Sequence, residues 1–332
     1  MFANVTILIV SLVVILISCE FFTNAIEWFG KKLKVGEGVV GSIFAAVGTC
    51  LPETLVPLIA IFSGSAEGSE VGIGAIAGAP FMLSTLAFFI TGLAVVIYSG
   101  CKRRTTEMSI NTNIISRDIM FFIFVYSIAI AASFVKIRMV HYSVAAFLIL
   151  AYVYYVYLTS KRDSHSDSEL EELTFAKIFK CDTSMGIILF QLAVAMTGII
   201  IGAEFFVKAM ESTSHVLNIS PLIISLILAP IATELPEKFN SVIWIGRKKD
   251  TLALGNITGA MVFQSCIPVS IGLLFTSWDL NNIALFSALV SILSALINYI
   301  MLKLRNKMSP YVLMSGGIFY IALIGYIVIN VF

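Results

Sequence analysis

Long apolar runs without a charged residue recur along the chain, and they constrain its fold more than any other feature. Only 12% of the residues are charged and 59% are hydrophobic, whereas about a quarter of the residues in soluble domains are charged. A helix of roughly 20 residues crosses a bilayer. Eight runs reach or approach this length: Met1–Cys19, Val71–Cys101, Ile119–Val135, Met139–Ser160, Thr183–Ala203, Thr251–Trp278, Leu280–Leu302 and Met308–Phe332.

Two further segments, Val39–Phe62 and Ile219–Ile245, are as long but contain a few ionisable residues. A membrane-spanning strand is shorter and alternates between apolar and polar residues, which none of these segments does. The sequence therefore predicts an all-α polytopic membrane protein with ten transmembrane helices. The five cysteines have no CxxC spacing, and no Gly-Lys-Ser/Thr follows a glycine-rich loop. We therefore expect neither a zinc site, nor a nucleotide site, nor any other cofactor.

The basic residues lie mostly on one side of the predicted membrane. Ten spans divide the loops into two sets, and the loops of one set contain only three basic residues, Lys136, Arg138 and Lys208. Because cytoplasmic loops carry the excess of Lys and Arg, we expect a multi-pass protein of the plasma membrane with both termini outside. The cytoplasmic set would be Lys31, Lys32, Lys34, Lys102, Arg103, Arg104, Arg117, Lys161, Arg162, Lys177, Lys180, Arg247, Lys248, Lys249, Lys303, Arg305 and Lys307.

The chain also contains an internal repeat at an offset of 184 residues. "CEFFTNAIEWFG" (Cys19–Gly30) aligns with "AEFFVKAMESTS" (Ala203–Ser214), and "TCLPE" (Thr49–Glu53) aligns with "TELPE" (Thr233–Glu237). This alignment predicts two five-helix repeats, 1–160 and 183–332, joined by a cytoplasmic linker, 161–182, that we expect to be a solvated loop. An odd number of spans per repeat makes the second repeat inverted, and inverted repeats are typical of secondary transporters.

Each copy of the motif places a proline and a carboxylate in a membrane span. Pro52 has no N–H, so the carbonyl of Gly48 loses its helical partner, and Pro236 frees the carbonyl of Ala232 in the same way. We expect both helices to be interrupted there. A free carbonyl inside a bilayer is costly, and a cation is a suitable occupant.

Each motif also supplies a hydroxyl and a carboxylate four residues apart, a spacing that puts both on one helix face. The predicted cation ligands are thus Thr49, Glu53, Thr233 and Glu237, with the carbonyls of Gly48 and Ala232 as further candidates. Such hard oxygen ligands suit Ca²⁺, Mg²⁺ or Na⁺. In the helices that follow, we expect glycines to allow close helix contacts: Gly74, Gly78, Gly255 and Gly259.

At these motifs the chain resembles the sodium/calcium exchanger family of the cation/calcium antiporter superfamily. There each repeat reads roughly Gly-Thr-Ser-x-Pro-Glu, followed by a Gly-Asn-x-x-Gly-Ser-Asn-x-x-Asn helix. The resemblance covers nearly the whole chain and implies ten helices, an extracellular N-terminus and transport of Ca²⁺. It also implies that the calcium site is formed by Thr49, Glu53, Thr233 and Glu237, all of which are present.

The chain departs from the family pattern at the positions that the resemblance assigns to sodium. The motif serines are replaced by Cys50 and Glu234, and the serines of Gly-Ser-Asn are replaced by Ala79 and Ala260. The last Asn or Asp of the second helix is Leu83 in one repeat and Gln264 in the other. Most of the expected sodium ligands are therefore missing, which favours H⁺ over Na⁺ as the coupling ion.

Lys238 lies inside a predicted span, four residues after Glu234. This is the favourable helical spacing for an ion pair, and a lysine in a bilayer requires a partner. Lys238 either simply neutralises Glu234 or places its ammonium where relatives bind Na⁺. The sequence leaves both interpretations open.

We interpret the chain as a secondary antiporter, not an enzyme, that exports Ca²⁺ or a related divalent cation by alternating access. The alternatives are a sodium/calcium exchanger with unusual sodium sites, an ion-binding relative that does not transport, a cation channel and, more distantly, an intramembrane enzyme with paired carboxylates. The expected partners are membrane lipid and inorganic cations, and we expect no nucleic acid.

Overall fold

The computed structural model describes residues 2–32, 51–160 and 172–331, and these residues contain helices but no β-strand. The helices are α1 (Phe2–Lys32), α4 (Leu51–Phe62), α5 (Ala66–Met82), the π-helix η2 (Leu83–Ala87), α6 (Phe88–Gly100), α7 (Thr112–Ser133), α8 (Arg138–Ser160), α9 (Thr174–Phe179), α10 (Met185–Leu217), α11 (Pro221–Gly246), α12 (Asp250–Phe275), α13 (Asn282–Arg305) and α14 (Pro310–Val331).

Eight helical runs in the described part of the chain are long and apolar enough to cross a membrane. One of them, Ala66–Gly100, combines α5, η2 and α6. Two shorter apolar stretches, Glu53–Phe62 and Pro221–Glu234, lie in α4 and α11. Every segment that the sequence predicts to span the membrane thus contains a helix, and the all-helical membrane fold is confirmed.

Two helices are much longer than their apolar runs. α1 continues to Lys32 and α10 continues to Leu217, whereas the predicted spans end at Cys19 and Ala203. Hydrophobicity marks where a helix leaves the lipid, but hydrogen bonding continues the helix until a capping signal ends it. Asn218, in the left-handed conformation, provides that signal for α10.

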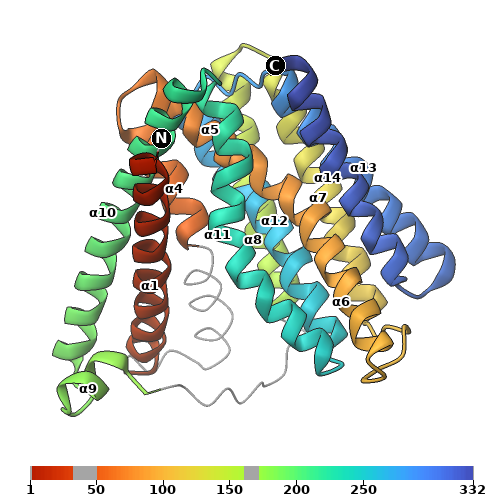
Figure 1. The fold of residues 1–332 in the computed structure, drawn as a ribbon, viewed down its shortest axis with the longest axis horizontal. Helices are drawn as coiled ribbons and strands as arrows, with labels where there is room; N and C mark the ends of the chain where they lie inside the picture. The colour runs from red at the N-terminus through yellow and green to blue at the C-terminus, as the bar shows by residue number, and fades with distance from the viewer. Residues whose placement is uncertain (1, 33–50, 161–171, 332) are drawn as a thin grey trace.

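The helices form a bundle in which α1 and α10 lie side by side at one edge (Figure 1). α11 packs along α5, and α12 packs against α7, α8 and α11. The start of α1 and the end of α14 lie toward the same end of the bundle (Figure 1). Large apolar side chains point outward along the helices, with Ile329 82% exposed and Ile321 71% exposed, as expected of a surface in contact with lipid.

Part of the predicted linker is folded, which corrects the expectation of a solvated loop. α9 lies within it and packs against α1 and α10. Leu173 is buried in a small apolar cluster with Ala25 and Ile188. The buried amide of Gln191 accepts a hydrogen bond from the Phe175 N–H at 2.8 Å and donates one to the Phe21 carbonyl at 2.9 Å. The apolar residues after the acidic stretch therefore dock on the bundle, while 161–171 lies outside the described residues.

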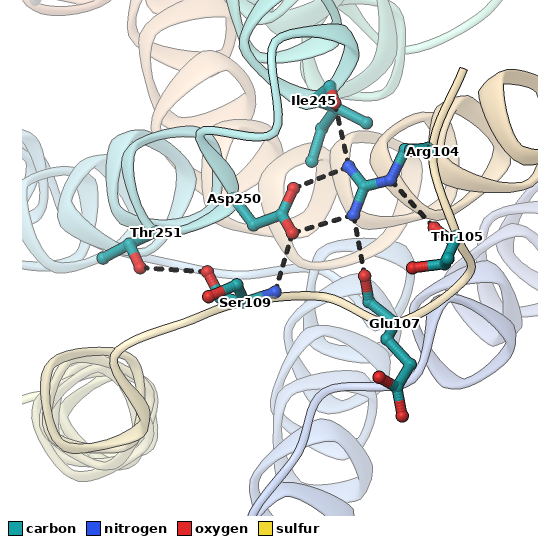
Figure 2. A network of polar contacts seen from close by, with 7 residues as sticks. All are labelled: Arg104, Thr105, Glu107, Ser109, Ile245, Asp250 and Thr251. Carbon is teal, nitrogen blue, oxygen red and sulfur yellow. Dashed lines mark hydrogen bonds and ion pairs between the residues drawn. The ribbon is translucent and has the colours of Figure 1, made fainter.

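A buried ion pair joins the two halves of the chain (Figure 2). Arg104, in the loop after α6, donates to Asp250 Oδ1 at 2.6 Å and to Oδ2 at 2.8 Å. The remaining guanidinium N–H groups reach the carbonyls of Thr105, Glu107 and Ile245. Such a bidentate and fully hydrogen-bonded pair has a defined geometry. It therefore holds the loop after α6 against the start of α12.

Candidate cation site

One residue from each copy of the repeated motif lines the same small cavity in the bundle. Glu53 from α4 and Thr233 from α11 both line it. The cavity has about 10 Å³ of free space, roughly the room that one water-sized sphere needs. The other lining residues are apolar: Val56, Pro57, Ala75, Ala79, Ala229 and Pro230.

The two polar side chains of this cavity are buried. Glu53 is 5% exposed and Thr233 is 3% exposed. The Thr233 hydroxyl donates to the carbonyl of Ala229 at 3.1 Å. Because the hydroxyl uses its own proton in that bond, its oxygen lone pairs stay available as acceptors. The cavity thus offers a carboxylate and a hydroxyl oxygen to a dehydrated cation.

Glycines on α5 bring the backbone of α11 close to this cavity. A Cβ added at Gly74 would lie 2.2 Å from the Leu222 carbonyl oxygen, and one at Gly78 would lie 2.1 Å from that of Leu226. The predicted role of these two glycines in close helix contact is therefore confirmed. Gly255 and Gly259 have no such contact with described atoms. The repeat alignment predicts that Gly255 and Gly259 contact positions 38 and 42, which lie 184 residues before Leu222 and Leu226. Positions 38 and 42 are outside the described residues.

A second polar cluster is centred on Glu234, the residue of α11 that follows Thr233. Glu234 pairs with Lys238 at 3.3 Å, as their spacing predicts, and both side chains are 2% exposed. The amide nitrogen of Gln264, on α12, donates to the other carboxylate oxygen of Glu234 at 2.8 Å. A cation, an anion and an amide are therefore held together in the interior, between α11 and α12.

α11 is a single helix from Pro221 to Gly246, so the expected interruption at Pro236 is not present. A proline removes one hydrogen bond, but packing of neighbouring helices can keep the rest of the helix in place. Ala232 is buried one residue before Thr233. The side chain of Glu237 is outside the described part of the structure, and so are Gly48, Thr49 and Cys50. Their roles remain predictions.

Another buried carboxylate, Asp118, is not among the residues that the sequence predicts to be functional. It precedes the predicted span that begins at Ile119, yet it lies in α7 and is 1% exposed. It accepts hydrogen bonds from Arg117 at 2.9 Å and from the Thr258 hydroxyl at 3.0 Å. The adjacent Arg-Asp pair was the available signal, since paired charges can extend a helix beyond its apolar run. This contact joins α7 to α12 and lies apart from the cavity lining.

Comparison with known proteins finds one family that matches most of the chain. The sodium/calcium exchanger protein family matches residues 3–161 and 187–332. An uncharacterized membrane protein of Methanocaldococcus jannaschii, MJ0091, is 24% identical over 289 residues, which are 87% of each chain.

Two solved structures share the fold over nearly the entire chain. The crystal structure of the H⁺/Ca²⁺ exchanger CAX has a TM-score of 0.74 and 16% identity, covering 97% of this chain and 82% of that one. The sodium-calcium exchanger NCX_Mj, soaked with Na⁺ and Sr²⁺, has a TM-score of 0.58 and 19% identity, covering 98% of both chains. Because the family match extends over both 3–161 and 187–332, this chain belongs to the sodium/calcium exchanger protein family.

Proposed function

We propose that this protein is a secondary antiporter that exports Ca²⁺, or a related divalent cation, in exchange for H⁺ by alternating access. The observation that carries the proposal is the cavity at which Glu53 and Thr233 meet. Glu53 is the last residue of the first motif copy and Thr233 is the first residue of the second copy, and the two copies lie 184 positions apart. A transporter with inverted repeats is expected to form its ion site at such a repeat interface.

In this proposal the transported cation is held by Thr49, Glu53, Thr233 and Glu237, with the carbonyls of Gly48 and Ala232 nearby. Carboxylate and hydroxyl oxygens are the ligands that Ca²⁺ prefers. The apolar remainder of the cavity lining favours a cation that has shed its water, because a small dry site strengthens each ion–oxygen contact. When the cation leaves, a proton can bind the same carboxylate oxygens, so one site serves both ions in turn.

The proposed architecture is ten transmembrane helices in two inverted halves, 1–160 and 183–332, with both termini outside the cell. Helix contacts in the described residues agree with a two-fold relation between the halves. Under the repeat alignment α1 corresponds to α10, and these two pack on each other. α5 packs on α11, and the corresponding pair, α12 with α4, is also in contact.

The similar solved structures include an H⁺/Ca²⁺ exchanger and a sodium-calcium exchanger, so the shared fold does not distinguish H⁺ from Na⁺ as the coupling ion. We therefore base this choice on individual residues in and beside the cavity. Ala79 contributes a methyl group to the cavity where the family pattern has a serine. Glu234, at the second motif serine, is already engaged by Lys238 and Gln264. Both features disfavour Na⁺ binding beside the central cation. The family name itself favours Na⁺, and sodium coupling is therefore the second candidate.

Gradient-driven efflux from proteoliposomes tests the proposal. Vesicles loaded with radioactive Ca²⁺ are given either an inward H⁺ gradient or an inward Na⁺ gradient at equal ionic strength. We expect the H⁺ gradient to drive efflux and the Na⁺ gradient to leave it at the level of a choline control. Glu53→Gln and Glu237→Gln should each abolish the efflux, because an amide can neither neutralise Ca²⁺ nor take up the proton.

Glu204→Gln is the matched control, since Glu204 is exposed on α10 and pairs with Lys208. It should transport at the wild-type rate. Efflux that Na⁺ drives as well as H⁺ does would refute proton coupling. Isotope exchange between Ca²⁺ pools, without any gradient, separates a transporter from a relative that only binds the ion. Single-channel currents would indicate a pore instead.

A further inference from the structure

The cluster of Glu234, Lys238 and Gln264 lies next to the proposed transport site, and none of the three is among the residues that line the cavity. Glu234 immediately follows Thr233, which lines the cavity, and its carboxylate is engaged on both oxygens. All three side chains are at most 2% exposed. A buried cation of this kind is expensive, so its presence here requires an explanation.

Gln264 provides the second observation. Its amide nitrogen donates to Glu234, but its amide oxygen is buried and has no hydrogen-bond partner among the described residues. Because the two amide atoms are bonded to the same carbon, the unused oxygen stays close to the Glu234 carboxylate. A carboxylate and an orphan amide oxygen are the ligands expected around a small hard cation.

We propose that this cluster is a monovalent-cation site with a built-in cation, the ammonium of Lys238. The ammonium neutralises Glu234 and fills the space between α11 and α12 that a free ion would otherwise take. Removing it should expose a Na⁺ site formed by Glu234 and Gln264. This inference deepens the proposed function. A site that the lysine ammonium already occupies cannot bind a transported Na⁺, and the consequence for ion coupling rests on the protein being the antiporter proposed above.

A purely neutralising role for Lys238 makes a different prediction. If the lysine only balances the charge of Glu234, its loss leaves an uncompensated buried carboxylate and destabilises the protein in every salt. If the cluster is a cation site, Na⁺ replaces the lost ammonium and restores stability. The response of a lysine-free variant to Na⁺ therefore separates the two roles.

The experiment measures the melting temperature of the purified full-length protein in detergent as NaCl replaces choline chloride at constant ionic strength. We expect Lys238→Ala to melt lower than wild type in choline and to be stabilised by Na⁺ in a saturable manner, as for a ligand that binds the folded state. Wild type should show no saturable response to Na⁺. Adding Gln264→Leu to Lys238→Ala should raise the half-saturating Na⁺ concentration by about tenfold, because one ligand oxygen is lost.

Two further variants complete the design. Glu234→Gln combined with Lys238→Ala should lose the Na⁺ response, because the carboxylate is gone. Lys208→Ala removes the lysine of the other Glu–Lys pair at the same helical spacing, which is exposed on α10. It should show no Na⁺ response, since water and salt already screen that carboxylate.

The proposal is overturned if Lys238→Ala melts identically in Na⁺ and in choline. Lys238→Ser is made in parallel in case the alanine variant is not recovered. A variant that can be purified in NaCl but not in choline chloride supports the site. If neither variant can be purified in NaCl or in choline chloride, the proposal is contradicted. Stability is measured without transport, so a failure of Ca²⁺ efflux in wild type would refute the proposed function and leave this test intact.

Discussion

At the scale of single residues, Ala79 determines how many oxygens the central cavity can offer. It lies on α5, is 4% exposed, and lines the cavity together with Glu53 and Thr233. Its methyl group cannot coordinate an ion, so the described side chains of the cavity contribute one carboxylate and one hydroxyl. A hydroxyl at this position would add a hard oxygen ligand without a large change in volume.

We therefore predict that Ala79→Ser makes transport sensitive to Na⁺. External Na⁺ should inhibit Ca²⁺ uptake by the variant with an affinity roughly tenfold higher than for wild type, the gain expected from one additional ligand oxygen. The measurement is initial Ca²⁺ uptake into proteoliposomes as Na⁺ replaces choline. Ala77→Ser is the control and should respond like wild type, because Ala77 lies on the same helix but is buried in an apolar cluster and does not line the cavity. Equal Na⁺ inhibition of both variants would show that the added hydroxyl does not reach the ion.

At the scale of single residues the sequence predicts some features and not others. The carboxylate and proline in an apolar run pointed to Glu53 and the repeat alignment pointed to Thr233; both line the cavity, and their role as cation ligands stays a prediction. The spacing of Glu234 and Lys238 along one helix was sufficient to predict their ion pair. The hydrogen bond from Gln264 was not predictable, since it depends on the rotation of α12 against α11, and no local pattern encodes that rotation.

At the scale of elements, the contact between α5 and α11 decides the width of the cavity. Gly78 lies opposite the Leu226 carbonyl and beside Pro230, which lines the cavity. A methyl group there would meet backbone atoms, and backbone atoms cannot rotate away. The helices would have to separate to accept it.

Gly78→Ala should accordingly destabilise the protein by about 1–3 kcal/mol, the usual cost of overpacking, and should lower Ca²⁺ affinity. Thermal unfolding in detergent and Ca²⁺ uptake measure the two effects. Gly325→Ala is the matched control, because a Cβ at Gly325 of α14 would have no described atom within 4 Å. It should be neutral or slightly stabilising, since alanine favours helix more than glycine does. A stable Gly78→Ala with unchanged affinity would mean that the helices can move apart without cost.

Elements differ in how well the sequence predicts them. Every apolar run contains a helix, because a span must satisfy its own backbone hydrogen bonds. Helix ends were less predictable: α1 and α10 extend beyond their apolar runs. η2 was not anticipated at all, since a π-helix is a local response to packing and lacks a composition signal.

At the scale of the whole molecule, the site belongs to neither half alone. Glu53 comes from the first repeat and Thr233 from the second. α1 and α10 pack mainly on each other, and their contacts with the remaining helices are less extensive. The internal repeat predicted that the two motifs would lie near each other, because transporters built from inverted repeats form their ion site at the repeat interface. The docking of α9 was not predictable, since an amphiphilic linker gives no sign of its partner.

The orientation of the whole molecule in the membrane can be tested with its own cysteines. Cys101 and Cys181 are exposed, whereas Cys19 and Cys266 are buried. Cys101 follows α6 in a loop rich in basic residues. By the excess of positive charge on cytoplasmic loops, Cys101 should face the cytoplasm.

We predict that a membrane-impermeant maleimide labels Cys101 only after cells are permeabilised, in a variant with Cys50→Ser and Cys181→Ser. With Cys101→Ser added, Lys136→Cys in the exposed loop between α7 and α8 should be labelled in intact cells. The parent without that new cysteine should stay unlabelled under both conditions, because its two remaining thiols are buried. The reverse pattern would show that the basic loops face the outside of the cell. It would contradict the predicted orientation, on which the proposed direction of Ca²⁺ transport depends.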